Sequence, residues 1–69
     1  MAAKIHTVAA MCSGGRVTTH TAHIVIKASG WDIRCYDRSK GKLADRILTA
    51  ETQAEARAIA RLWCEGVLN

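Results

Sequence analysis

The most concentrated chemistry in this sequence is a group of basic side chains close to Trp31 and Tyr36. Residues 23–48 carry six lysines and arginines against three aspartates, a net charge of +3, whereas residues 49–69 carry a net charge of −1. Basic side chains can follow phosphates, and arginine and tyrosine can reach base edges or sugars. We therefore predict a surface that binds nucleic acid or another partner, formed by Lys27, Arg34, Tyr36, Arg38, Lys40, Lys42 and Arg46.

The same charges have a second interpretation. Exposed strands commonly carry lysines and arginines that prevent edge-to-edge aggregation, and such a hairpin needs no ligand. The formal net charge of +4 and the isoelectric point near 9.4 are compatible with an anionic partner without requiring one. Both interpretations stay open at the level of the sequence.

Metal-binding and nucleophilic side chains are poorly placed for chemistry. His20 and His23 are three residues apart, which puts them on opposite faces of a strand, and the sequence has no Cys-x-x-Cys pair. Cys35 alternates with Ile33, which is typical of a small buried residue. A chain of 69 residues also has little material for both a core and an enclosed active site. We therefore expect no enzyme, no metal and no cofactor.

The cysteines and the apolar runs bear on location. The three cysteines cannot all pair within the chain, and we detect no signal peptide, which favours a reducing cytoplasm over secretion. No apolar run approaches the roughly 18 residues that span a bilayer. We therefore expect a cytoplasmic protein without a membrane partner.

Glycine-containing turns divide the first two thirds of the chain into four short segments. Gly14-Gly15 suits a two-residue hairpin turn, Ser29-Gly30 marks a second turn, and residues 37–42 suit a longer turn with Gly41 in a left-handed position. Such short connections favour antiparallel neighbours. The predicted strands are Ile5–Met11, Val17–Ala28, Trp31–Tyr36 and Leu43–Leu48.

The last third of the sequence has the periodicity of one amphipathic helix. It begins after Thr49 or Thr52, since either can cap it, and Gly66 is a suitable stop. The apolar stripe consists of Ala56, Ile59, Ala60, Trp63 and Val67. The expected architecture is a single α+β domain over residues 1–69, a four-stranded antiparallel meander with one C-terminal helix packed on one face.

One helix covers only one face of such a sheet, so strand parity predicts what the other face displays. Trp31, Ile33 and Cys35 share one face of their strand, and the helix should cover this apolar set together with Ile24 and Ile26. The uncovered face would then present His23, Val25, Lys27, Arg34 and Tyr36. The register of the fourth strand stays open because Ile47 and Leu48 are adjacent.

Residues 30–42, followed by a strand and the Ala-rich segment 49–58, resemble sheet-plus-helix DNA-binding domains. These include the arm-binding domains of phage-type integrases and the plant ethylene-response-factor domains. The resemblance covers about residues 30–62 and implies that the sheet enters the major groove, with Arg34, Tyr36, Arg38, Lys40, Lys42 and Arg46 as contacts. The sequence departs from the families in lacking a late aromatic residue in the final strand and in having an extra N-terminal strand.

The length of the chain is also similar to that of small phage-encoded inhibitors of bacterial defence, including anti-CRISPR proteins. This likeness implies an alternative function, a protein that inhibits a host complex handling nucleic acid, in the host cytoplasm. The basic surface would then meet an acidic protein surface or cover a nucleic-acid site. A homodimer formed through the sheet face or an edge strand is compatible with either function.

Overall fold

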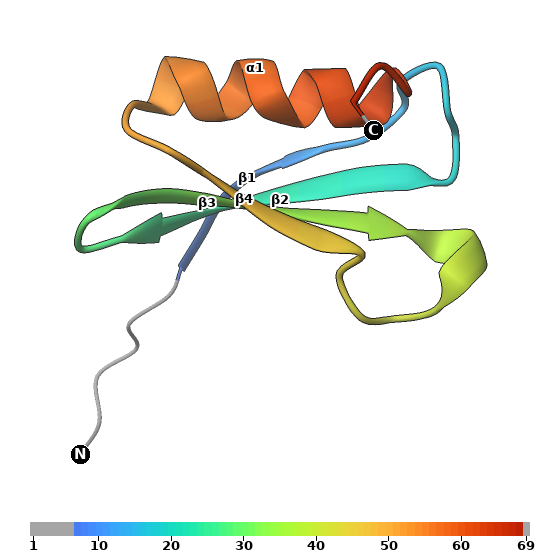
Figure 1. The fold of residues 1–69 in the computed structure, drawn as a ribbon, viewed down its shortest axis with the longest axis horizontal. Helices are drawn as coiled ribbons and strands as arrows, with labels where there is room; N and C mark the ends of the chain where they lie inside the picture. Colours follow the sequence, from blue (N-terminus) through green and yellow to red (C-terminus); the bar gives the residue numbers. More distant parts are fainter. Residues whose placement is uncertain (1–6, 69) are drawn as a thin grey trace.

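The computed structural model describes residues 7–68, which form one antiparallel sheet and one helix packed across it (Figure 1). The strands are β1 (Thr7–Cys12), β2 (His20–Lys27), β3 (Gly30–Asp37) and β4 (Arg46–Ala50), in the spatial order β1-β2-β3-β4, with a short 3₁₀ helix η1 (Arg38–Lys40) and the helix α1 (Gln53–Cys64). This arrangement confirms the predicted ββββα meander. Ile5, where we expected the first strand to begin, lies outside the described residues. No helix within residues 7–68 is long and apolar enough to cross a membrane.

The core lies between α1 and one face of the sheet. Its buried members are Ala22, Ile24, Ile33, Cys35, Ala50, Ala56, Ala60, Trp63 and Cys64. Trp31 packs against this cluster, as we predicted, and is partly exposed. Ile26, which we also expected the helix to cover, is 43% exposed. Burial raises the pKa of Cys35 to about 11 and that of Cys64 to about 12, so both remain thiols at neutral pH.

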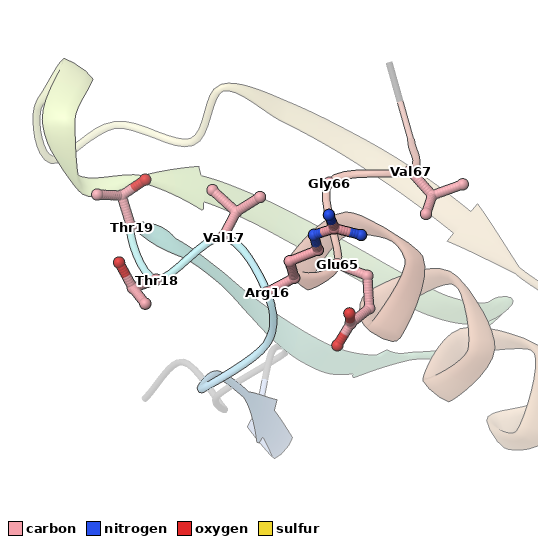
Figure 2. A pocket seen from close by; sticks show the side chains of 7 residues that line it. All are labelled: Arg16, Val17, Thr18, Thr19, Glu65, Gly66 and Val67. Carbon is pink, nitrogen blue, oxygen red and sulfur yellow. The ribbon is translucent and has the colours of Figure 1, made fainter.

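The prediction of a two-residue Gly14-Gly15 hairpin turn is wrong. β1 ends at Cys12 and β2 begins at His20, and the intervening loop packs against the C-terminal end of α1. The Val17 amide donates to the Cys64 carbonyl oxygen at 3.0 Å, and a Cβ at Gly15 would lie 2.5 Å from that oxygen. Figure 2 shows loop residues 16–19 facing residues 65–67 across an open pocket of about 580 Å³. Gly15 therefore permits close approach to the helix.

Local hydrogen bonds set both ends of α1. The Thr52 hydroxyl oxygen accepts a hydrogen bond from the Glu55 amide at 3.1 Å, which selects Thr52 over Thr49 as the cap. At the other end Gly66 adopts a φ of +77°, and its amide donates to the Trp63 carbonyl oxygen at 3.1 Å. The left-handed glycine closes the helix where the sequence predicted a stop.

Trp63 fastens the end of α1 to three strands. Its indole stacks on the His20 ring, with centroids 4.0 Å apart and planes 5° apart, and the Arg46 guanidinium carbon lies 5.5 Å from the indole centroid. The Trp63 Nε1 donates to the Tyr36 carbonyl oxygen at 3.0 Å, and His20 Nδ1 lies 2.9 Å from the Trp63 carbonyl oxygen. These contacts fix the ends of β2, β3 and β4 on the same residue.

Asp37 holds the turn that follows β3. One carboxylate oxygen accepts from the Ser39 hydroxyl at 2.6 Å and from the Ser39 amide at 3.0 Å, which begins η1. The other carboxylate oxygen lies 3.5 Å from His20 Nε2. The pKa of Asp37 is lowered from its usual 3.8, first by the Ser39 hydroxyl and amide and then by the nearby His20 and Lys40. The ionised form of Asp37 therefore stabilises the folded chain.

This arrangement predicts a pH-dependent effect of Ser39→Ala. A carboxyl group with a lowered folded pKa contributes stability above its unfolded pKa, and this contribution is lost as pH falls through the folded pKa. Losing the Ser39 hydroxyl moves the folded pKa of Asp37 back toward 3.8. Ser39→Ala should therefore lower the unfolding free energy more at about pH 6 than at about pH 3. Urea denaturation of both proteins at the two pH values measures the difference, and an equal loss at both would contradict the assignment.

The close approach of α1 to the sheet predicts a cost for enlarging Ala56. Ala56 is fully buried, whereas Ala58, two residues along the same helix, is exposed. Ala56→Leu should reduce the unfolding free energy by about 1–3 kcal/mol through overpacking. Ala58→Leu is the matched control and should stay within about 0.5 kcal/mol of the original chain in urea denaturation. Equal effects of the two substitutions would mean that α1 does not lie this close to the sheet.

Candidate functional site

The sheet face opposite α1, which we call the open face, carries the side chains that parity predicted. The β2–β3 register pairs His23 with Arg34, Thr21 with Tyr36 and Val25 with Asp32. Among residues 7–68, no helix or further strand covers this face (Figure 1). The open face is therefore where the basic side chains of β2 and β3 meet solvent.

One end of the open face is neutralised by an ion pair. Lys27 Nζ lies 3.3 Å from an Asp32 carboxylate oxygen. Val25, although on the open face, is only 1% exposed and pairs in register with Asp32 and Val8. Lys27, one of the predicted binding residues, is thus engaged within the chain at the end of the sheet away from η1.

The centre of the open face holds Arg34 between two strands. Arg34 pairs in register with His23 on β2 and with Ile47 on β4. Its Nε is buried and finds no hydrogen-bond acceptor in the part of the chain that the structure describes. A buried donor without an acceptor costs free energy unless a ligand or water supplies one. Part of the hydrogen-bonding capacity of the Arg34 guanidinium is therefore unused by the described residues.

Next to Arg34 lies an open depression of about 690 Å³, which we call the Tyr36 depression. It forms because the chain after β3 turns away from α1, toward the open-face side of the sheet (Figure 1). Two rings on adjacent strands contribute to its lining, His23 and Tyr36, with centroids 4.8 Å apart and planes 49° apart. The full lining is Thr21, His23, Tyr36, Arg38, Gly41 and Lys42.

Two cations from the β3–β4 connection belong to this lining. The Arg38 amide donates to the Thr19 carbonyl oxygen at 2.9 Å, and the Arg38 guanidinium donates to the Thr18 carbonyl oxygen at 3.2 Å. Lys42 is exposed. Within residues 7–68, no carboxylate oxygen lies within 4.0 Å of a charged nitrogen of Arg34, Arg38 or Lys42. The Tyr36 depression thus combines aromatic surface with positive charge that no acidic side chain neutralises directly.

Lys40 and Arg46 lie elsewhere. Lys40 Nζ and Arg46 Nε each lie 3.8 Å from an oxygen of the Asp45 carboxylate. Arg46 pairs in register with Cys35 on the face toward α1, where it packs over Trp63. This register, which the sequence left open, turns Arg46 inward. Of the seven predicted binding residues, the structure groups Arg34, Tyr36, Arg38 and Lys42, and it separates Lys27, Lys40 and Arg46 from them.

The open face also carries exposed apolar side chains that we did not predict as part of a site. Met11 is 67% exposed, Ile47 55% and Val8 49%. A bulge between Val8 and Ala10 brings both Val8 and Met11 to this face although they are three residues apart. Strand parity places His23 on this face, but the predicted binding residues do not include it. Its position on the same face as Tyr36, on the adjacent strand, is the feature that would have added His23 to the predicted site.

His20 and His23 lie on opposite faces of β2, as predicted, with His20 against Trp63 and His23 against Tyr36. Within the described residues, no group of three or more histidine, cysteine, aspartate or glutamate side chains is placed to hold a metal ion. Cys35 and Cys64 are buried in the core, away from the Tyr36 depression. The chemistry offered by the open face is that of recognition by charge, hydrogen bonds and ring stacking.

No family model matches this chain, and neither a curated protein nor a solved structure matches it in sequence or fold.

Proposed function

We propose that this chain is a non-catalytic protein that binds nucleic acid through the Tyr36 depression and the adjoining Arg34. The observation that carries the proposal is that Arg38 and Lys42 line one depression with two aromatic rings, beside Arg34, and that among the residues described no carboxylate neighbours these three cations. A phosphate backbone supplies the anions that such cations attract, and bases and sugars supply partners for the rings.

The arrangement of donors supports phosphate as the anion. The Arg38 guanidinium is held by the Thr18 carbonyl oxygen, so little further ordering is needed when it binds. Arg34 carries a buried Nε without an acceptor. A phosphate oxygen that reaches the Arg34 guanidinium would accept charge-assisted hydrogen bonds, which are the stronger ones in proteins. The same two arginines are less suited to an uncharged ligand.

We place the chain in a reducing compartment such as the cytoplasm. All three cysteines are free, and the buried Cys35 and Cys64 serve as core residues. Free buried thiols are typical of compartments where glutathione and thioredoxin keep cysteine reduced. Nucleic acid is accessible in the same compartment.

A second candidate function is inhibition of a host nucleic-acid-handling complex by protein binding. The exposed Val8 and Met11 on β1 favour it, together with Ile47 on β4 at the opposite edge of the sheet, because exposed apolar side chains on an open face are typical of protein interfaces. A complex with one such host assembly that survives nuclease treatment and is lost in Ile47→Asp would support this candidate. A complex that nuclease abolishes would support direct nucleic-acid binding instead.

The nucleic-acid proposal predicts a position-dependent loss of affinity. Arg34→Gln and Arg38→Gln should each weaken binding to a labelled oligonucleotide by about 1.5 kcal/mol, about tenfold in Kd. Arg57→Gln is the matched control, because Arg57 is exposed on α1 and changes the net charge equally. Fluorescence anisotropy over a series of salt concentrations provides the measurement. Each open-face substitution should also reduce the slope of log K against log salt by about 1.

Two outcomes would count against this proposal. Equal weakening by Arg57→Gln would show that overall charge, and not the open face, determines the affinity. Failure of the unsubstituted chain to bind either single-stranded or duplex oligonucleotides at low salt would exclude nucleic acid as the ligand of this surface.

A further inference from the structure

The two aromatic rings of the Tyr36 depression suit one part of a nucleic acid, which is the base. His23 and Tyr36 are half-buried on neighbouring strands and line the same space. Aromatic side chains bind nucleic acid mainly by stacking on the faces of bases, and this stacking tolerates any base. In a duplex both faces of each base are already covered by the neighbouring base pairs. The rings can therefore stack on a base only when that base is outside a double helix.

The aromatic rings and the cations of the Tyr36 depression come from different parts of the chain. Tyr36 and His23 belong to strands, whereas Arg38 and Lys42 belong to the connection that follows β3. The depression thus has aromatic groups contributed by the sheet and positive groups contributed by the loop. A nucleotide has the same division, with an apolar base face at one end and a phosphate at the other. A base stacked on the rings would leave its phosphate within the field of the loop cations.

Size and hydrogen bonding point to the same ligand. The open depression has a volume of about 690 Å³, which lies in the range of about 300–1,000 Å³ that small-molecule sites occupy. This volume is sufficient for one or two nucleotides. Thr21, which pairs in register with Tyr36, adds a hydroxyl group to the lining that can donate to or accept from a base edge or a sugar.

We infer that the Tyr36 depression takes an unpaired base together with its phosphate, and that this chain binds single-stranded nucleic acid in preference to duplex. The inference rests on the proposed function and narrows it to one class of ligand. The base stacks on Tyr36 beside His23, the phosphate lies between Arg38 and Lys42, and Arg34 contacts the next phosphate along the strand. A nucleoside monophosphate offers the same base and phosphate but has no second phosphate for Arg34.

The test compares ligands with one sequence and different strandedness. Binding of a labelled single-stranded 12-mer of mixed sequence and of the duplex formed by the same strand is measured by fluorescence anisotropy at low salt. We expect the single strand to bind at least about tenfold more tightly, since stacking on one exposed aromatic side chain commonly contributes that much. Thymidine monophosphate, used as a competitor, should not displace the oligonucleotide at an equal concentration of nucleotide units. Displacement at that concentration would assign the site to free nucleotides and overturn the single-strand assignment.

Tyr36→Leu and Tyr36→Phe separate the ring from its hydroxyl group and from its volume. Tyr36→Leu should weaken single-strand binding about tenfold and weaken duplex binding less, whereas Tyr36→Phe should bind the single strand within about twofold of the original chain. The Tyr36 carbonyl oxygen that accepts from Trp63 is a backbone atom, so both substitutions keep that contact. Thermal unfolding checks that each variant folds.

A measurement on the unsubstituted chain makes the test independent of folding in the variants. In amide NMR spectra, addition of the single-stranded 12-mer should shift the signals of Thr21, His23 and Gly41 more than those of α1. Shifts centred on α1 would overturn the inference. Equal affinity for single strand and duplex, with Tyr36→Leu as tight as the original chain, would overturn it and leave the proposed function standing. Absence of binding to both ligands would instead remove the proposed function itself.

Discussion

Trp63 is where the sheet and the helix are joined, and the rest of the fold depends on that junction. Its indole is stacked by His20 from β2, approached by Arg46 from β4, and hydrogen-bonded to the end of β3. The other buried residues of α1 are small, so Trp63 is the largest side chain that the helix contributes to the core. With so little apolar volume elsewhere, a single aromatic anchor determines where α1 lies, and α1 in turn determines which sheet face stays open.

The same junction positions the Tyr36 depression from the helix side of the sheet. Asp37 follows Tyr36 in β3 and faces the helix side, where it contacts His20 and starts η1 through Ser39. Because neighbouring residues in a strand point to opposite faces, the anchoring of Asp37 on the helix side directs Tyr36 to the open face. The loop that carries Arg38 begins at this fixed point. The contacts of Asp37 on the helix side thus fix the direction of the preceding side chain, Tyr36, in the depression.

Sequence periodicity predicted the elements and faces well where a repeating pattern was present. The alternation of Ile33 and Cys35 with Arg34 and Tyr36 placed all four residues on the correct faces, and the Thr52 cap and Gly66 stop were both among the predicted helix limits. The Gly14-Gly15 connection was wrong because the close approach of Gly15 to the Cys64 carbonyl is a tertiary contact between residues far apart in sequence. Local turn chemistry carries no information about that contact.

The candidate site was predicted only in part, because charge counted along the chain ignores where each carboxylate lies. Asp45 lies 3.8 Å from both Lys40 and Arg46, and Asp32 pairs with Lys27, so three of the predicted cations have acidic neighbours. The sequence shows these aspartates but not their distances, and the fourth strand could not be oriented because Ile47 and Leu48 are both apolar. Once Leu48 is inward, Arg46 follows it to the helix side and Ile47 becomes exposed on the open face. The surface that remains is smaller than the predicted hairpin but better defined, since within residues 7–68 its cations have no carboxylate neighbour and lie beside the rings of His23 and Tyr36.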